Sequence, residues 1–332
     1  MRIGYFADGP WSHRALDKII KTQGLEVVFI VARYDSADPI LHDYAKRLQV
    51  PYLLHPNVNS HEFIEMIKGY CADILVSMSF NQILKANIIQ LALKGFINCH
   101  AGALPFYRGR NILNWALING EKSFGVTVHY VDEGIDTGDI ILQKFSEIGP
   151  DDDYATLLDK AISLCADTLR EALELISEGR SQRIKQTAIH PVGFYCGRRR
   201  DGDEWIDWGW PSERIHNFVR AITTPGPCAR THLGDKIIAI ICTELVGDAP
   251  LYIGTPGEVV GRDEKGIVVK TGDTTLRVTQ IAGVSDDGML AGKRLPAHSI
   301  GTRLGVNPWE RIVHLEKQLA KLERTIISNG RD

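Results

Sequence analysis

Two polar side chains stand one residue apart at the end of a β-branched, apolar run. These are Asn98 and His100, with Cys99 between them. Residues two apart on a strand share a face, so we expect Asn98 and His100 to project together past a strand end while Cys99 turns into the packing. Asp136 follows in an acidic, glycine-containing segment. The spacing predicts a polar site built from a strand end and a later loop.

The sequence around these residues resembles one enzyme family. Residues 98–109 are similar to the Asn-x-His-x-x-x-Leu-Pro-x-Tyr-Arg-Gly signature of the formyltransferases that use 10-formyltetrahydrofolate, and residues 136–139 resemble their downstream Asp-x-Gly motif. Two positions depart from the family pattern: Gly102 replaces a usual serine, and Ala103 replaces a common leucine. These departures leave Asn98, His100 and Asp136 intact, but they indicate a folate pocket that differs in detail from that of the family.

The resemblance implies roles in acyl transfer for three residues. When an amine attacks a formyl carbon, negative charge develops on the formyl oxygen, and Asn98 with a protonated His100 would donate hydrogen bonds to it. Loss of one such donor typically costs about 3 kcal/mol. His100 would also move protons from the attacking amine toward N10 of the folate, while Asp136 orients the ring and holds its pKa up.

The resemblance also implies which residues bind the cofactor, 10-formyltetrahydrofolate. Two loops match pterin-binding positions, and their residues are Gln82, Ile83 and Leu84 in the first and Asp132, Glu133, Gly134 and Ile135 in the second. Arg110 matches a further folate contact but could equally clamp the phosphate of an acceptor. The six cysteines show no CxxC spacing, so no metal is expected.

The acceptor amine is the least determined feature. Likeness to sugar-nucleotide formyltransferases, such as the formyltransferase domain of the bifunctional aminoarabinose enzyme, favours a UDP- or dTDP-linked amino sugar of glycan or lipopolysaccharide synthesis. The sequence segments that carry this likeness are Arg108-Gly109-Arg110, Leu113-Asn114-Trp115, Cys196-Gly197-Arg198-Arg199 and His216-Asn217. The reaction would pass through a tetrahedral intermediate.

Other members of the family offer alternative functions. A methionyl-tRNA formyltransferase would normally carry a basic insertion after the second strand, whereas residues 33–39 contain two acids and one base. A 10-formyltetrahydrofolate hydrolase shares the motifs and stays open. The β-rich C-terminal half disfavours the single-domain glycinamide ribonucleotide enzymes, and the intact catalytic trio disfavours a folate-binding protein without turnover.

The charge pattern gives no sign of a nucleic-acid partner. The formal net charge is −3, and acids follow directly after the basic run 198–200. That run is therefore interpreted as a solvated turn. His129 lies within a predicted strand and is expected to serve packing alone.

The order of elements predicts the fold class. Short β-branched runs alternate with helical patterns over the first half, which indicates a Rossmann-like, mostly parallel sheet. Beyond Pro225 the apolar period changes to two, as in a small β-rich, OB-like domain. We expect a formyltransferase domain at 1–190, a connector with a helix at 191–225, a β-rich domain at 226–305 and an amphipathic helix at 306–332.

A cytoplasmic protein without membrane segments is expected, because no apolar run approaches 18 residues and no signal peptide is evident. The terminal helix carries an apolar stripe two heptads long. It consists of Ile312, Leu315, Leu319, Leu322 and Ile326. The stripe fits a homodimer and packing against the chain's own body equally well.

Overall fold

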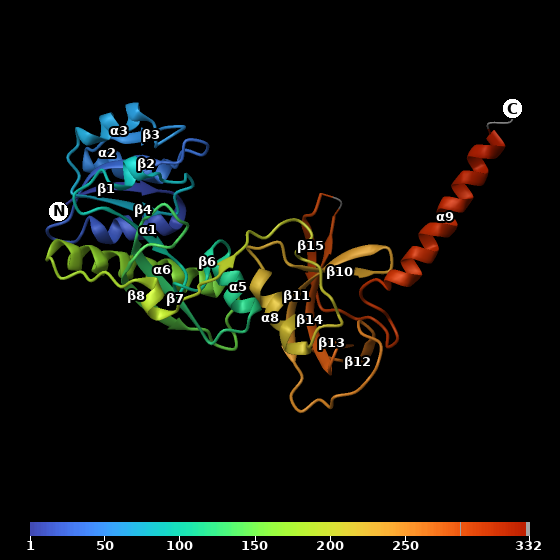
Figure 1. Cartoon of the computed structure of the whole chain (residues 1–332). Helices are drawn as coiled ribbons and strands as arrows, with labels where there is room; N and C mark the ends of the chain where they lie inside the picture. The colour runs from blue at the N-terminus through green and yellow to red at the C-terminus, as the bar shows by residue number, and fades with distance from the viewer. Residues whose placement is uncertain (286, 330–332) are drawn as a thin grey trace. The chain divides into compact units, whose positions relative to one another are not determined.

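The computed structural model describes residues 1–285 and 287–329 and divides the chain into two compact units, 1–199 and 200–332. The first unit is built on a seven-stranded sheet of order β3-β2-β1-β4-β5-β7-β8 (Figure 1). Its strands are β1 (Arg2–Ala7), β2 (Glu26–Ala32), β3 (Tyr52–Leu54), β4 (Ile74–Met78), β5 (Phe96–His100), β7 (Ser123–Tyr130) and β8 (Ile140–Glu147).

The strands from β3 to β5 pair in parallel, and β7 and β8 add an antiparallel edge. This arrangement confirms the predicted mostly parallel α/β fold. β1, β2 and β4 are buried almost throughout, as strands covered on both faces must be. Because β1 to β5 are parallel, their carboxyl ends meet at one edge, where open α/β sheets bind ligands.

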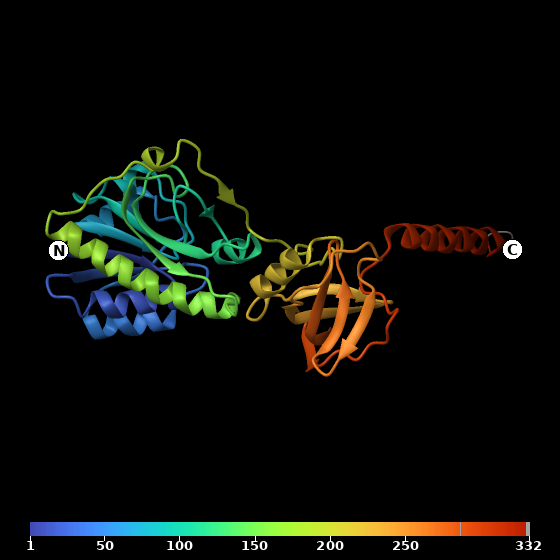
Figure 2. The ribbon, with the colours of Figure 1, turned by 90° about the horizontal axis from the view of Figure 1, so that it is seen from below.

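Helices cover this sheet. They are α1 (Gly9–Ile19), α2 (Pro39–Leu48), α3 (His61–Lys68), α4 (Ala86–Ile89), α5 (Ile112–Ile118), α6 (Tyr154–Ser177) and α7 (Gln186–Ile189). The long helix α6 packs against α1, β7 and β8 (Figure 2). A capping box between Asp153 and Thr156 starts α6, and Gly179, at φ 69°, follows its end.

An aromatic cluster anchors the strand that carries the Asn-x-His motif. Phe6 of β1 contacts Phe29, Phe63, Phe80 and Phe96, with ring centroids 5.1–6.4 Å apart. Phe96 begins β5 and is 1% exposed. Aromatic pairs of this kind add about 1 kcal/mol each beyond the area they bury. The cluster therefore fixes β5 in the sheet, and its carboxyl end with it.

Residues 186–199, called the strap from here on, close the first unit. The strap contains α7 and the short strand β9 (Tyr195–Cys196). β9 pairs in parallel with β6 (Arg108–Gly109), the last two residues of the motif at 98–109. The Gln186 side chain accepts from the Arg108 guanidinium at 2.6 Å. The end of the first unit thus lies against the loop that follows β5.

The second unit contains an antiparallel sheet, as predicted for a β-rich domain. Its elements are α8 (Ser212–Ile222), β10 (Ala229–Leu233), β11 (Lys236–Leu245), β12 (Val259–Asp263), β13 (Gly266–Lys270), β14 (Thr275–Val284), β15 (Leu290–Arg294) and α9 (Pro308–Asn329). Four residues of the predicted stripe, Ile312, Leu315, Leu319 and Leu322, are exposed on α9. The fifth, Ile326, lies outside the residues whose side chains are described. None of the described helices has the length and apolar character needed to cross a membrane.

Candidate active site

The antiparallel partner of β5 supplies a residue that the sequence did not point to. β5 pairs with β7 so that Asn98 lies opposite His129 and His100 opposite Thr127. Side chains directly opposite on neighbouring strands come within contact distance. The register thus brings His129, expected to serve packing alone, beside Asn98 at the sheet edge.

Asp136 reaches the strand ends from the loop between β7 and β8. Its backbone has φ 55°, a left-handed conformation that is uncommon for residues other than glycine. Two contacts hold it there: the Gly109 N–H donates to Asp136 Oδ2 at 2.9 Å, and the Gln186 side-chain amide donates to the Asp136 carbonyl at 2.9 Å. Gln186 therefore ties the strap to the acidic loop.

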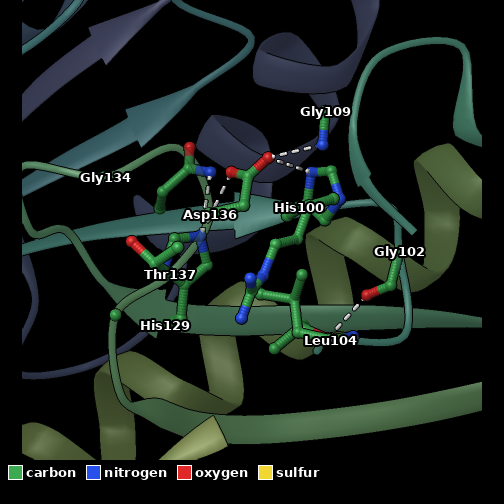
Figure 3. A network of polar contacts seen from close by, with 12 residues as sticks. His100, Gly102, Leu104, Gly109, His129, Gly134, Asp136 and Thr137 are labelled. Atoms are coloured by element: carbon green, nitrogen blue, oxygen red, sulfur yellow. Dashed lines mark hydrogen bonds and ion pairs between the residues drawn. The ribbon is translucent and has the colours of Figure 1, made fainter. Parts of the chain in front are cut away.

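His100 faces an oxygen at each ring nitrogen. Figure 3 shows one Asp136 carboxylate oxygen joined by dashed lines to the His100 ring and to Gly109. Its Nε2 donates to the Tyr107 carbonyl at 2.7 Å, and its Nδ1 lies 3.6 Å from Asp136 Oδ2. The tautomer is assigned from this network. A protonated ring satisfies both oxygens, whereas the neutral ring with Nε2–H turns a lone pair toward Asp136. The site can therefore hold a proton on His100 or release it.

His129 links Asn98 to Asp136. Its Nδ1 donates to the Tyr130 carbonyl at 2.8 Å, so neutral Nε2 is an acceptor and receives the Asn98 side-chain N–H at 3.3 Å. The same Nε2 lies 3.6 Å from Asp136 Oδ1. An asparagine amide has two N–H donors, so one remains for a ligand once His129 has taken the other.

Burial and charge set the protonation of the site in opposite directions. Burial lowers the pKa of His100 from its ordinary 6.5, while Asp136 and the Tyr107 carbonyl act to raise it. Burial raises the pKa of the Asp136 carboxyl, but its interaction with His129 and the charge of His100 outweigh this and lower it to about 2. Asp136 is thus a carboxylate at neutral pH, facing a histidine that is easily deprotonated.

These groups open into a cavity of about 810 Å³. Asn98, His100 and Asp136 line it together, as predicted, and so does Arg110. The basic residue Arg198, interpreted as part of a solvated turn, also lines the cavity. The volume is of the size that small-molecule and cofactor sites usually have.

The two predicted pterin-binding loops do not contribute their predicted residues to the described lining of this cavity. Met78–Asn81 lines the cavity, but the next three residues, Gln82, Ile83 and Leu84, are not among the described residues that do. Gln82 instead joins the Val58 N–H to the His55 carbonyl, and Ile83 is 71% exposed. The folate-binding role of these three residues stays a prediction.

In the second loop, the described cavity lining includes Asp136 but none of the four residues before it. Those residues are Asp132, Glu133, Gly134 and Ile135. Asp132 Oδ1 accepts from Gly134 N–H and from the Thr137 hydroxyl, so it shapes the loop. Their contact with folate likewise stays a prediction.

The departure at Gly102 has a structural basis. A Cβ added there would lie 2.4 Å from the Tyr107 carbonyl oxygen and 2.5 Å from His100 Nε2. No real side chain tolerates such distances, so the loop after β5 passes this close to the His100 ring only because residue 102 is glycine. The Thr127 hydroxyl donates to the Gly102 carbonyl at 2.6 Å and holds the loop on β7.

Comparison with known proteins places the chain among related sequences. Residues 1–173 match the model described as formyl transferase, and residues 199–289 match the formyl transferase C-terminal domain. The chain is 32% identical to methionyl-tRNA formyltransferase of Geobacter sulfurreducens, over 92% of this chain and 97% of the relative. The same identity holds for the methionyl-tRNA formyltransferase of Desulforamulus reducens, over 92% and 98%.

Solved structures with this fold include two N-formyltransferases. The sugar 3N-formyl transferase WlaRD, crystallised with dTDP and 5-N-formyl-THF, superposes with a TM-score of 0.62 at 22% identity, over 84% of this chain and 97% of its own. The N-formyltransferase of Helicobacter canadensis, in complex with folinic acid and dTDP-3-aminofucose, gives 0.64 at 21%, over 88% and 99%. At these identities the likeness shows a shared fold.

Proposed function

Because this chain belongs to the formyl transferase family, we propose that it moves the formyl group of 10-formyltetrahydrofolate to the α-amine of methionine carried on tRNA. One observation carries the choice of acceptor: relatives that align over nearly their whole length at 32% identity are methionyl-tRNA formyltransferases. Both family domains are present, so the likeness extends beyond the catalytic unit.

The amino-sugar nucleotide favoured by the sequence analysis is wrong. The sugar-modifying enzymes match at 21–22% identity, whereas methionyl-tRNA formyltransferases match at 32% over the full length. The motif segments behind that interpretation are short, two to four residues each, whereas the match to the methionyl-tRNA enzymes extends over 318 residues. The proposal also departs from the expectation of no nucleic-acid partner, which rested on the net charge of −3 and on the acids that follow the basic run 198–200.

Each catalytic group has a role that its surroundings support. Asn98, held by His129, directs its second N–H to the formyl oxygen as negative charge develops there. His100 takes a proton from the attacking amine, and the Asp136 carboxylate stabilises the imidazolium that results. His129 sets the position of Asn98, and the Gly109 N–H and the Gln186 amide hold Asp136.

The atoms balance in two steps. The methionine nitrogen attacks the formyl carbon and gives a tetrahedral intermediate, while His100 accepts the amine proton. The bond from carbon to N10 then breaks, and the proton passes to N10, so that tetrahydrofolate and formylmethionyl-tRNA leave. No external oxidant, reductant or metal enters this balance.

The test is formyl transfer to charged tRNA. Purified protein is incubated with 10-formyltetrahydrofolate and methionyl-tRNA, the ester is hydrolysed, and formylmethionine is measured by mass. The His100→Ala variant serves as the control for background transfer. We expect rapid formylation by the wild type alone. Absence of formylmethionine would contradict the proposal, and tetrahydrofolate release that needs no tRNA would assign a hydrolase instead.

A further inference from the structure

The strap carries a basic residue into the catalytic cavity. Three hydrogen bonds position it: the Arg110 N–H donates to the Cys196 carbonyl at 3.1 Å, the Trp115 indole donates to the Gly197 carbonyl at 2.9 Å, and the Arg199 N–H donates to the Asn111 side chain at 3.0 Å. Arg198 lies between the last two anchor points and lines the cavity with Arg110. Two arginines 88 residues apart therefore serve the same cavity.

The charges of these two arginines are not offset. Both side chains are exposed, and within the described part of the chain neither forms an ion pair with a carboxylate. Arg33, also in the cavity lining, contacts Asp8 and Asp35 at 3.2 Å each, so its charge is balanced. The uncompensated positive charge of the cavity thus belongs to Arg110 and Arg198.

The start of α1 does not provide an alternative anion site. Its Gly9 N–H donates to the Asp38 carboxylate at 2.9 Å, and Asp8 precedes it. The Asp38 carboxylate already accepts from the first N–H of this helix, so an incoming phosphate would meet a like charge there. An anion that enters the cavity is left with the two guanidinium groups.

We propose that Arg198, together with Arg110, binds the phosphate that links the methionyl-adenosine end of the acceptor to the preceding nucleotide. This inference rests on the proposed function. Guanidinium groups bind phosphate oxygens through paired N–H donors, which fixes orientation as well as affinity. A phosphate held at this side of the cavity would anchor the terminal nucleoside and direct its methionyl amine toward His100 and Asp136.

Two small acceptors, one with and one without the phosphate, test the contact between Arg198 and the phosphate apart from other contacts with the acceptor. The first is 2′(3′)-O-methionyl-adenosine, and the second is the same ester with a 5′-phosphate. We expect the wild type to favour the phosphorylated acceptor. Arg198→Ala should lower kcat/KM for the phosphorylated acceptor about ten- to hundredfold, as loss of a hydrogen bond to a charged group does, and leave the other acceptor unchanged.

Arg200→Ala is the matched control, because it removes the same charge two residues away from an exposed residue outside the described cavity lining. It should behave as wild type with both acceptors. On methionyl-tRNA, Arg198→Ala should make log kcat/KM fall less steeply with log salt, by about 0.7 for one phosphate contact in a single strand. The melting temperature of each variant is measured to establish that it is folded.

The outcomes distinguish failure of the phosphate contact from failure of the proposed function. If the wild type formylates methionyl-tRNA but Arg198→Ala affects both small acceptors equally, the phosphate contact is overturned while the proposed function stands. A raised KM for 10-formyltetrahydrofolate alone would likewise overturn it, since the donor's carboxylates would then be the anion bound. If the wild type formylates no methionyl acceptor, the proposed function fails and the inference fails with it.

Discussion

At the scale of single residues, the site depends on two side chains that share one strand face. Replacing either His100 or Asn98 by alanine should lower turnover by two or more orders of magnitude, because each supplies a proton-transfer or oxyanion contact worth that much. Formyl transfer is measured at saturating substrates, and circular dichroism checks that the fold is kept. Near-wild-type turnover in His100→Ala would contradict the mechanism.

The charge of Asp136 should affect how kcat depends on pH. Burial lowers the pKa of His100 below 6.5, and the Asp136 carboxylate partly offsets this. Because the neutral ring accepts the amine proton, log kcat should fall as pH drops through that lowered pKa. Asp136→Asn removes the opposing charge, so the pKa falls further and the acidic limb moves to lower pH. A limb that stays in place, or moves to higher pH, would exclude this role.

His129 should act through its neighbours. His129→Leu removes the acceptor for the Asn98 amide and the contact with Asp136, so kcat should fall about tenfold while KM changes little. His129→Gln can still accept from Asn98 and should recover part of the loss. Equal kcat in the two variants would argue against positioning of Asn98.

The sequence indicated Asn98, His100 and Asp136 because a local motif contains them. His129 could not be found in that way, since its contact with Asn98 depends on the register between β5 and β7. With the register known, His129 would have been identified, because it lies directly opposite Asn98 and can accept from its side-chain amide. Arg198 was missed for a similar reason: its position depends on the pairing of β9 with β6.

At the scale of elements, the loop after β5 has no room for a side chain at residue 102. In Gly102→Ala, the new Cβ must displace the Tyr107 carbonyl or the His100 ring, so turnover should fall at least tenfold. Gly197→Ala is the control, because its Cβ meets no atom within 4 Å. Unchanged turnover in Gly102→Ala would mean that the loop can move without cost to the chemistry.

The elements themselves followed well from apolar periodicity. The alternation of runs predicted β1, β2, β4 and β5 and the helices α1 and α2, because buried parallel strands and amphipathic helices have distinct patterns, but it did not predict α3 and α4. Short pairings such as β6 with β9 contain two residues each and leave no periodic signal. The part of the strap from residue 191 on was therefore assigned to the connector at 191–225.

At the scale of the whole molecule, a net charge of −3 says little about the acceptor, because binding depends on where cations are exposed. We expect kcat/KM for methionyl-tRNA to fall steeply between low and physiological salt, as each released counterion adds to the slope. The KM for the folate donor should change far less. A weak salt dependence for tRNA would indicate that few phosphates are engaged.

The strap has a consequence for building hybrid enzymes. The two family matches end at residue 173 and resume at 199, so Gln186 and Arg198 fall in the stretch between them. A chimera joined at residue 173 would take its catalytic residues from one parent and its strap from the other. The strap contacts Asp136 through Gln186 and the loop after β5 through β9, so these contacts would then join unmatched parents. A junction at residue 190 would keep Gln186 and still lose β9. A domain exchange in this protein should therefore transfer residues 1–199 together, as a single segment.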